Sequence, residues 1–154
     1  MDFSHFNEEG HAKMVDVSLK DKTLRTAIAK CDVYVNKETL HQIKTGGIKK
    51  GDVLSVAQVA GIMACKNTSN IIPMAHPLPI SSIDIHFSLY DEGKIEVISE
   101  VKVNERTGVE MEALTACSVC ALTIYDMCKA LQKDIRIDNL HLVKKTGGKS
   151  DYEV

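Results

Sequence analysis

The architecture follows from the stretch GVEMEALTACSVCALTIYDMCKALQK, which runs from Gly108 to Lys133. Within it, 13 residues without a charge separate Glu112 from Asp126. An uncharged, uninterrupted run of that length predicts a helix that is buried nearly all round. We therefore expect this stretch to form the central helix of the core.

Asp126 stands at the far end of that helix, with Lys129 three residues further on. Side chains at this spacing meet on a helix, so one interpretation is an exposed ion pair that only stabilises the helix. In the other, burial raises the pKa of the carboxyl while the lysine lowers it, and the carboxyl moves protons near neutral pH. The spacing alone does not choose between the two.

The composition is that of an ordinary globular domain, with 154 residues, of which 44% are hydrophobic and 26% charged. The formal net charge of −2 provides no basic field for nucleic acid. No uninterrupted apolar run is long enough to cross a membrane, and the start MDFSHFNEEGHAK lacks the apolar segment of a signal peptide. We expect a cytoplasmic protein that binds neither nucleic acid nor membrane.

The chain has five cysteines, and this odd number argues against a disulfide framework. Cys117 and Cys120 form a CxxC motif, but it lies inside the apolar helix rather than at its start, where a redox thiol gains acidity. No second CxxC or HxxxH accompanies it to complete a zinc shell. Small packing residues are therefore favoured over a metal or thiol site, and no metal ligands are predicted.

Alternating apolar and polar residues predict strands at residues 23–35, 81–90, 94–104 and 140–145, and two further helices at 37–44 and 53–66. The order strand, helix, strand, strand, helix, strand is that of the ferredoxin-like βαββαβ fold, an α+β sandwich with an antiparallel sheet and helices on one face. The other face is expected to be apolar enough for a second subunit to cover it. We expect one catalytic domain over residues 14–145, a flexible N-terminal arm over 1–13 and a flexible Gly/Lys tail over 146–154.

All three prolines of the chain, Pro73, Pro77 and Pro79, fall in the segment IIPMAHPLPIS. His76 directly precedes Pro77, so its backbone is biased to an extended form and its imidazole is presented from a stiff loop. A purely structural histidine is one interpretation. The other is a group held rigidly so that it can hydrogen-bond a substrate.

Polar residues also flank two of the helices. Thr107 and Glu110 match a capping box at the start of the central helix. Glu112 is not needed for that cap; it either interacts with the positive end of the helix or accepts hydrogen bonds from a heterocycle. Lys50 precedes the helix at 53–66, which Asp52 can cap, and could hold phosphate there, although Asp52 competes for the same backbone donors. A solvated face is the usual meaning of the late lysines, which are Lys129, Lys133, Lys144, Lys145 and Lys149.

Distance adds one constraint. Glu112 and Asp126 are 14 residues apart, which separates them by roughly 21 Å on one helix. A small ligand cannot touch both ends of the same helix. If both carboxyls act in one site, two copies of the chain must contribute to it.

Seven segments together resemble the cyclic pyranopterin monophosphate synthase family of molybdenum cofactor biosynthesis. They run in order over almost the whole chain, and the ordered set is specific although no single piece is. The segments are MVDVS (14–18), KGDV (50–53), AGIMACKNT (60–68), IPMAHPL (72–78), TGVEMEALTA (107–116), LTIYDMCKA (122–130) and the GGKS tail. Two positions depart from the family pattern: Ala75 stands where the family commonly has cysteine, and Asp151 where glycine is common.

The resemblance implies a lyase that is a homohexamer, three dimers, with active sites between subunits. It implies that (8S)-3′,8-cyclo-7,8-dihydroguanosine 5′-triphosphate is converted to cyclic pyranopterin monophosphate and that diphosphate leaves. By the same resemblance Asp126 is the catalytic acid/base and Lys129 its partner. The remaining residues that it implies are Lys50 and His76 in catalysis, and Met74, Ala75, His76, Met111, Glu112, Arg25 and Lys145 in substrate binding.

This chemistry suits these side chains. Rearranging the base moves protons on and off ring nitrogens and the sugar carbonyl, which fits Asp126, Lys129 and His76. Forming the cyclic phosphate as diphosphate departs calls for a lysine cluster that stabilises developing charge. No resident cofactor is expected, and magnesium only as an ion carried by the triphosphate. The alternatives are a non-catalytic nucleotide-binding module of the same fold and a thiol or metal protein that uses Cys117 and Cys120.

Overall fold

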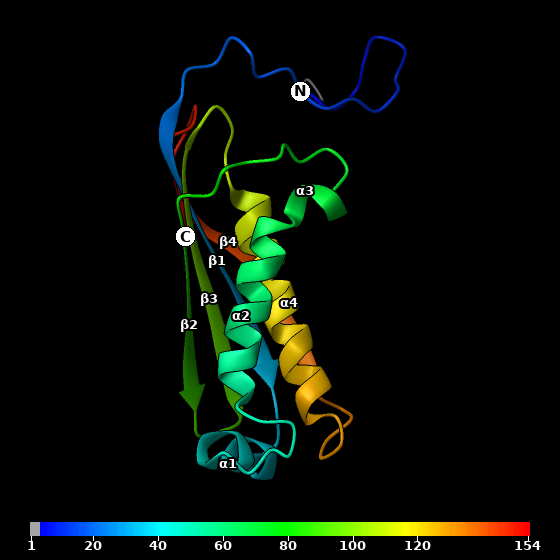
Figure 1. Cartoon of the computed structure of the whole chain (residues 1–154), viewed down its shortest axis with the longest axis vertical. Coiled ribbons are helices and arrows are strands. Elements are labelled where there is room, and N and C mark those ends of the chain that lie inside the picture. The colour runs from blue at the N-terminus through cyan, green and yellow to red at the C-terminus, as the bar shows by residue number, and fades with distance from the viewer. Residues whose placement is uncertain (1–3) are drawn as a thin grey trace.

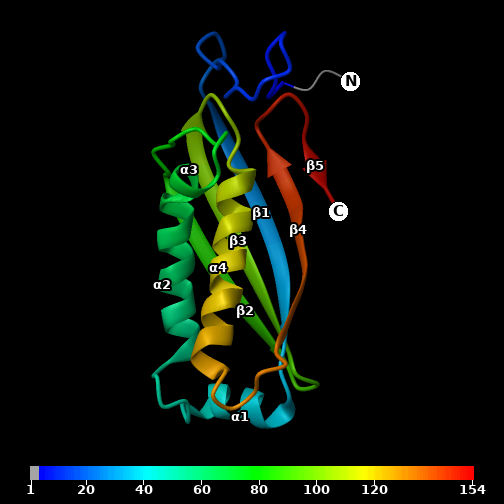
Figure 2. The same ribbon diagram turned by 90° about the vertical axis from the view of Figure 1, so that its right-hand side faces the viewer.

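The computed structural model describes residues 4–154. Its strands form one antiparallel sheet in the order β2-β3-β1-β4-β5, and α2 and α4 lie side by side over one face of it (Figures 1 and 2). The predicted ferredoxin-like α+β sandwich is therefore confirmed. In chain order the elements are β1 (Thr23–Tyr34), α1 (Lys37–Thr45), α2 (Val53–Lys66), α3 (Thr68–Ile71), β2 (Ser82–Tyr90), β3 (Lys94–Glu105), α4 (Glu110–Cys128), β4 (Arg136–Thr146) and β5 (Tyr152–Glu153).

The two central strands, β1 and β3, form the floor of the core because most of their alternate residues are apolar and buried. Ala27 pairs with Val101 and Val33 with Ile95, and all four side chains are fully buried beneath the helices. Successive side chains of a strand point to opposite faces, so this register puts one face of each strand against α2 and α4. The alternation seen in the sequence thus fixes which face is covered.

The opposite face of the sheet is charged. The partly exposed residues that alternate with the core positions include Lys30 and Asp32 on β1 and Glu96, Glu100 and Lys102 on β3. Ile28 of β1 and Ile98 of β3 lie on this face as well, and the expectation that a second subunit covers it stays a prediction. Most apolar residues of β1 and β3 face the helices, because the pattern has a period of two.

Helix α1 is ended, and helix α2 is capped, by the residues that the sequence predicted. The Asp52 side chain accepts a hydrogen bond from the backbone N–H of Ser55 at 3.1 Å and caps α2, as predicted. Gly46 ends α1 in the left-handed conformation, at φ +73°, which a residue without Cβ adopts easily. The boundaries predicted for α2 are those observed, and α1 runs one residue further than predicted.

The start of α4 differs from its prediction. The N-cap position is Val109, without a side-chain hydrogen bond, so the capping box of Thr107 and Glu110 is wrong. Glu110 instead pairs with Lys145 at 3.2 Å. A tertiary ion pair has replaced the local interaction that the sequence motif suggested.

The chain termini contain short pairings. Residues Tyr152–Glu153 form β5, which pairs with Lys144 and Lys145 of β4, and Phe6 forms an isolated bridge with Ala12. Neither β5 nor the single-turn helix α3 was predicted, because two to four residues carry too little periodicity. Residues 1–3 of the predicted arm lie outside the described residues, and the division into arm, domain and tail stays a prediction.

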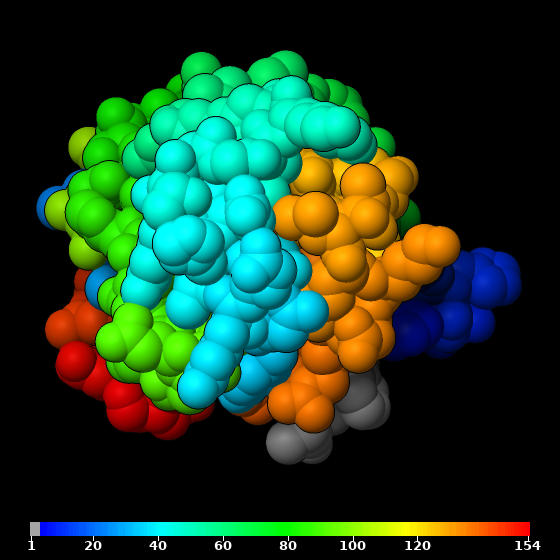
Figure 3. All heavy atoms as spheres, turned by 90° about the horizontal axis from the view of Figure 1, so that it is seen from below, coloured from blue at the N-terminus to red at the C-terminus, as the bar shows by residue number. Residues whose placement is uncertain are grey.

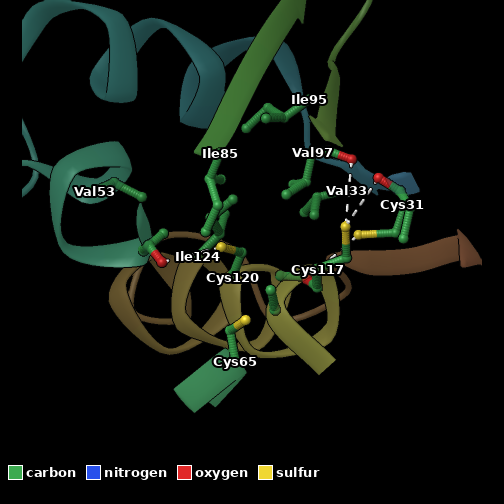
Figure 4. Packing of buried hydrophobic residues seen from close by; sticks show 14 of the residues in the cluster. Cys31, Val33, Val53, Cys65, Ile85, Ile95, Val97, Cys117, Cys120 and Ile124 are labelled. Carbon is green, nitrogen blue, oxygen red and sulfur yellow. Dashed lines mark hydrogen bonds between the residues drawn. The ribbon is translucent and has the colours of Figure 1, made fainter. Parts of the chain in front are cut away.

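All five cysteines are free and buried. Figure 4 shows Cys31, Cys117 and Cys120 among the side chains packed between α4 and the sheet. The Cys117 thiol lies 3.2 Å from the Ser99 hydroxyl, and the Cys120 thiol lies 3.1 Å from the carbonyl of Ala57 on α2. Burial raises the pKa of Cys120 to about 12, so this thiol is not a nucleophile at neutral pH. The structure supports packing roles for the CxxC cysteines.

By length and composition alone α4 would suit a membrane span, with a mean hydropathy of 1.2. Its buried residues include Ala113, Cys117, Ala121 and Ile124, which pack on the sheet and on α2. The apolar character of this helix is accounted for by its place in the core.

Gly61 sets how closely α2 approaches α4. A Cβ there would lie 2.3 Å from the Cys120 thiol, 2.7 Å from Ile85 and 3.1 Å from the backbone oxygen of Ala116. We expect Gly61→Ala to lower the free energy of unfolding by about 1–3 kcal/mol, because overpacking outweighs the better helix propensity of alanine. Urea denaturation measures this change. Adding Cys120→Ala should recover part of the loss, and equal stability of Gly61→Ala and the parent would contradict the tight contact.

Candidate functional site

A cavity of about 740 Å³ opens at the end of the molecule where α4 begins. Its walls come from the arm that precedes β1, the proline-rich loop before β2, the first turn of α4 and the end of β4. It brings together six of the seven residues predicted to bind substrate, namely Met74, Ala75, His76, Met111, Glu112 and Lys145. The seventh, Arg25, lines an adjoining hollow of about 200 Å³ that shares Lys145.

His76 is held in this cavity by two backbone features. The loop turns through a hydrogen bond from the Ala75 N–H to the Ile72 carbonyl at 3.1 Å. The ring nitrogen Nε2 then donates to the carbonyl of Val15, in the segment that precedes β1, at 2.7 Å. The imidazole is therefore fixed from outside its own loop, by a segment 61 residues away in sequence.

Glu112 supplies a buried carboxyl to the cavity wall. The residue is only 4% exposed. Burial raises its pKa to about 7, and the nearby charge of Glu110 acts in the same direction. Glu112 can thus exist in either protonation state near neutral pH. A carboxyl of this kind can accept hydrogen bonds from the N–H groups of a heterocycle, or exchange a proton with it.

The raised pKa of Glu112 makes a pH-dependent contribution to stability. In the unfolded chain the carboxyl ionises near its model value of 4.5, and in the folded chain near 7. Between these values the folded state holds the extra proton, so its stability falls as pH rises, and the loss is complete above pH 7. We expect Glu112→Gln to leave the free energy of unfolding unchanged near pH 4 and to raise it by up to about 3 kcal/mol at pH 8.

Denaturant titrations at the two pH values measure this effect. Glu110→Gln is the matched control, because Glu110 is partly exposed and ion-paired with Lys145. It should lose less than about 1 kcal/mol at either pH. A Glu112→Gln variant with the same pH dependence as the parent would show that Glu112 ionises freely in the folded protein.

The basic side chains of the cavity are partly committed to the protein. Arg25 donates from Nε to the carbonyl of Glu105 at 2.8 Å and from Nη2 to that of Arg106 at 3.1 Å. Lys145 is paired with Glu110, and Lys20 and Lys149 complete the basic lining of the adjoining hollow. These cations can hold phosphate oxygens at the mouth of the cavity.

A second cluster lies at the other end of α4. Asp126 stands between two lysines, with Oδ1 2.6 Å from Nζ of Lys129 and Oδ2 3.2 Å from Nζ of Lys50. Lys50 also donates to the backbone carbonyl of Asp126 at 2.8 Å. Figure 3 looks onto this end, where the surface around α1 and the start of α2 adjoins that of the end of α4. We call Asp126, Lys129 and Lys50 the acid–lysine cluster.

The acid–lysine cluster is exposed in the single chain, which contradicts the burial considered for Asp126. Its side chain is 58% exposed, and hydrogen bonds from Lys129 and then Lys50 hold its pKa below the usual range. The same contact with Asp126 raises the pKa of Lys129. Both groups are therefore charged at neutral pH in the isolated chain.

The four residues predicted for catalysis are thus divided between two places. His76 lies in the cavity at the start of α4, while Asp126, Lys129 and Lys50 lie at its opposite end (Figure 1). Lys50 and Asp126 touch within one chain, so they belong to the same half of any shared site. Within one chain the structure does not bring the two sets together.

Sequence reasoning missed the contribution of the segment between residue 14 and β1, including Lys20. Val15 and Val17 line the cavity and are partly buried, whereas Asp16 and Ser18 are exposed. This short alternation was the available signal. The segment has no regular structure at these residues, so nothing in the sequence indicated which part of the fold it would contact.

The sequence is similar to a protein family and to proteins of known name. The model of the MoaC family matches residues 14–148. The chain is 60% identical over 151 residues to a protein of Thermoanaerobacter sp. (strain X514) named cyclic pyranopterin monophosphate synthase, an alignment covering 97% of this chain and 96% of that relative. Proteins of the same name from Desulfitobacterium hafniense and Bacillus pumilus are 57% and 56% identical, with 99% and 96% of this chain and 93% of each relative covered.

Proposed function

The chain belongs to the MoaC family, and on that premise we propose that its cavity and its acid–lysine cluster form one composite active site. The chain is an enzyme of molybdenum cofactor biosynthesis, a lyase. It converts (8S)-3′,8-cyclo-7,8-dihydroguanosine 5′-triphosphate to cyclic pyranopterin monophosphate and diphosphate. The proposal concerns how this chain's residues divide that work.

The observation that carries the proposal is the placement of two complementary halves at opposite ends of α4. The cavity provides shape, a buried carboxyl and a fixed imidazole, which are groups for recognising a heterocycle. The acid–lysine cluster provides a carboxylate and two ammonium groups, which transfer protons and stabilise phosphate charge. The cavity adds an enclosed space for a heterocycle, and the exposed cluster adds a carboxylate held between two lysines.

An exposed apolar stripe on the helical side indicates how two copies would meet. Val56, Val59 and Met63 recur at helical spacing on α2, and Leu122 lies on the neighbouring α4; each is 45% to 58% exposed. The stripe is centred near the middle of both helices. Contact between two such stripes would remove this apolar surface from water, which favours a dimer through the helices rather than through the charged sheet face.

A two-fold axis through the middle of α4 places the two halves opposite each other. Val119 is the central residue of α4, and Glu112 and Asp126 are each seven residues from it. In an antiparallel pair, the partner subunit's Asp126 therefore reaches the level of Glu112. Each dimer then has two composite sites, each with a cavity from one chain and an acid–lysine cluster from the other.

Burial in the dimer also suits the chemistry of Asp126. In the single chain its lysine neighbours hold the pKa low, which makes the carboxylate a weak base. Covering it with a partner removes water, and desolvation moves a carboxyl pKa upward. The carboxylate can then take a proton from the rearranging base while Lys129 supplies one, and His76 and Glu112 hold the heterocycle.

The basic groups then act on phosphate. Lys50 lies within reach of both Asp126 and the substrate's phosphate end in this arrangement, and Arg25 and Lys145 lie at the cavity mouth. Their charge stabilises the departing diphosphate as the cyclic phosphate forms. No resident cofactor is part of the proposal. Within residues 4–154 no three metal-binding side chains gather, and any magnesium would arrive with the triphosphate.

We extend the pairing to a hexamer of three dimers in the cytoplasm, the assembly that the family resemblance implies. Sedimentation equilibrium measures the oligomeric state. The charged open face of the sheet remains available for contacts between dimers or for solvent.

The experiment that tests the proposal supplies the cyclised nucleotide to the purified protein. Release of diphosphate together with a fluorescent oxidised pterin is expected. The competing candidate is a nucleotide-binding module that uses the same lysines and the His76 loop without a proton shuttle. Tight substrate binding with no product would support that module and would remove the composite catalytic site.

A further inference from the structure

The segment between residue 14 and β1 reaches the candidate site through one hydrogen bond that no sequence motif suggested. His76 Nε2 lies 2.7 Å from the carbonyl oxygen of Val15. A carbonyl oxygen can only accept, so Nε2 must carry the hydrogen. In the neutral ring the other nitrogen, Nδ1, is then the acceptor, and among residues 4–154 it has no hydrogen-bond partner.

The segment that carries this carbonyl is held on its C-terminal side. Asp16 accepts from the Ser18 N–H at 2.9 Å, which closes a turn just after Val15. The Lys20 carbonyl accepts a hydrogen bond from Arg106 Nε at 3.0 Å, which ties the segment to the loop between β3 and α4. Val15 and Val17 are the inward residues of this segment and line the cavity.

We propose that the backbone carbonyl of Val15 is a positioning group for catalysis. It fixes the ring of His76 so that Nδ1 is the nitrogen offered to a ligand, as an acceptor for an N–H or O–H of the substrate. The inference rests on the proposed function in that His76 serves the substrate site. Val15 acts through His76 and touches no reacting atom.

This role explains why a hydrogen bond is needed at all. Pro77 restrains the backbone of His76, but the imidazole can still rotate about its side-chain bonds. A ring free to rotate would present Nδ1 and Nε2 to the cavity in turn. The partner on a second segment removes that freedom, as a hydrogen bond to the remote nitrogen does for histidines that bind metals or protons elsewhere.

The test changes the carbonyl without changing a side chain. Incorporating the α-hydroxy analogue of Asp16 turns the Val15 carbonyl into an ester carbonyl, which is a weaker acceptor. The Asp16 N–H that is lost makes no hydrogen bond with any of residues 4–154. The matched control is the α-hydroxy analogue of Met14, which weakens the Lys13 carbonyl, an oxygen without a donor among the same residues.

We expect the ester at Asp16 to lower kcat/KM about threefold to tenfold, and the control ester to change it less than about 1.5-fold. In a His76→Ala background the ester at Asp16 should cause no further loss, because the carbonyl acts only through the imidazole. His76→Gln, which keeps a donor near the position of Nε2, should retain sensitivity to the ester. An equal loss in the parent and in His76→Ala, or no loss in the parent, would overturn the proposal.

A second readout does not depend on turnover. Nitrogen-15 NMR of the His76 ring, assigned by comparison with His76→Gln, reports which nitrogen carries the proton. We expect a protonated Nε2 in the neutral ring of the parent, and faster backbone hydrogen exchange at residues 14–18 in His76→Ala than in His76→Gln. A proton on Nδ1 would overturn the positioning role. Full activity of His76→Ala with the expected NMR signal would instead remove His76 from the proposed function.

Discussion

Asp126→Asn is expected to fold normally and to lose at least about 100-fold in kcat, since general acid–base catalysis contributes that much or more. The amide keeps the shape of the carboxyl and can still accept a hydrogen bond from Lys129 or Lys50. It cannot take up a proton at neutral pH. The loss therefore separates proton transfer from simple positioning.

The structure provides a close control for this substitution. Asp91 pairs with Lys44 at 2.7 Å in an exposed ion pair that shares no residue with either half of the site. The nearby lysine lowers the pKa of Asp91, as the two lysines do for Asp126. Asp91→Asn should keep both the parent's unfolding midpoint and its kcat. Product formation by Asp126→Asn at the parent's rate would show that this carboxyl is only a member of a surface ion pair.

Mixed oligomers of two nearly inactive chains should recover activity when the two substitutions fall in different halves of the site. We expect Asp126→Ala and His76→Ala chains, each retaining only a small residual activity alone, to give about one quarter of the parent activity when co-expressed at equal levels. Random pairing makes half of the dimers mixed, and each mixed dimer holds one intact site of two. The other site of that dimer carries both substitutions.

The control pair follows from the contact between Lys50 and Asp126 in one chain. Chains with Asp126→Ala and Lys50→Ala alter the same half, so every composite site in a mixed dimer lacks one of the two groups. This pair should stay inactive. Recovery by this pair, or no recovery by the first pair, would contradict the division of the site along α4.

The core fold could be predicted from the sequence because its signals are local and repeated. Alternation over β1 and β3 and the uncharged run of α4 each extend over ten or more residues. Many residues therefore indicate the same element, strand or helix. The predicted capping box of Thr107 and Glu110 does not form, because a motif of two residues stabilises the helix end no more than one tertiary ion pair does. Glu110 reaches Lys145 instead, and no local rule foresees a partner from the last long strand.

The candidate site was predicted as a set of residues but not as an arrangement. The resemblance named Lys50 and Asp126 together with His76, and the structure shows that the first two touch while the third lies at the other end of α4. The sequence also favoured two copies sharing a site, from the length of α4 alone. It did not identify the exposed apolar stripe on α2 and α4, because the composition of a helix does not tell which of its apolar residues the fold leaves uncovered.

By itself, the sequence determined the ferredoxin-like order of elements, the face of each strand that enters the core and the separation of Glu112 from Asp126. These depend on periodicity and on helical rise, which are properties of neighbouring residues. Only the tertiary structure decided the burial that raises the pKa of Glu112 to about 7, the closure of Lys50 on Asp126 and the bond from His76 to Val15. Each of these joins segments far apart in the chain or depends on the packing around a side chain, so its energy exists only after the chain has folded.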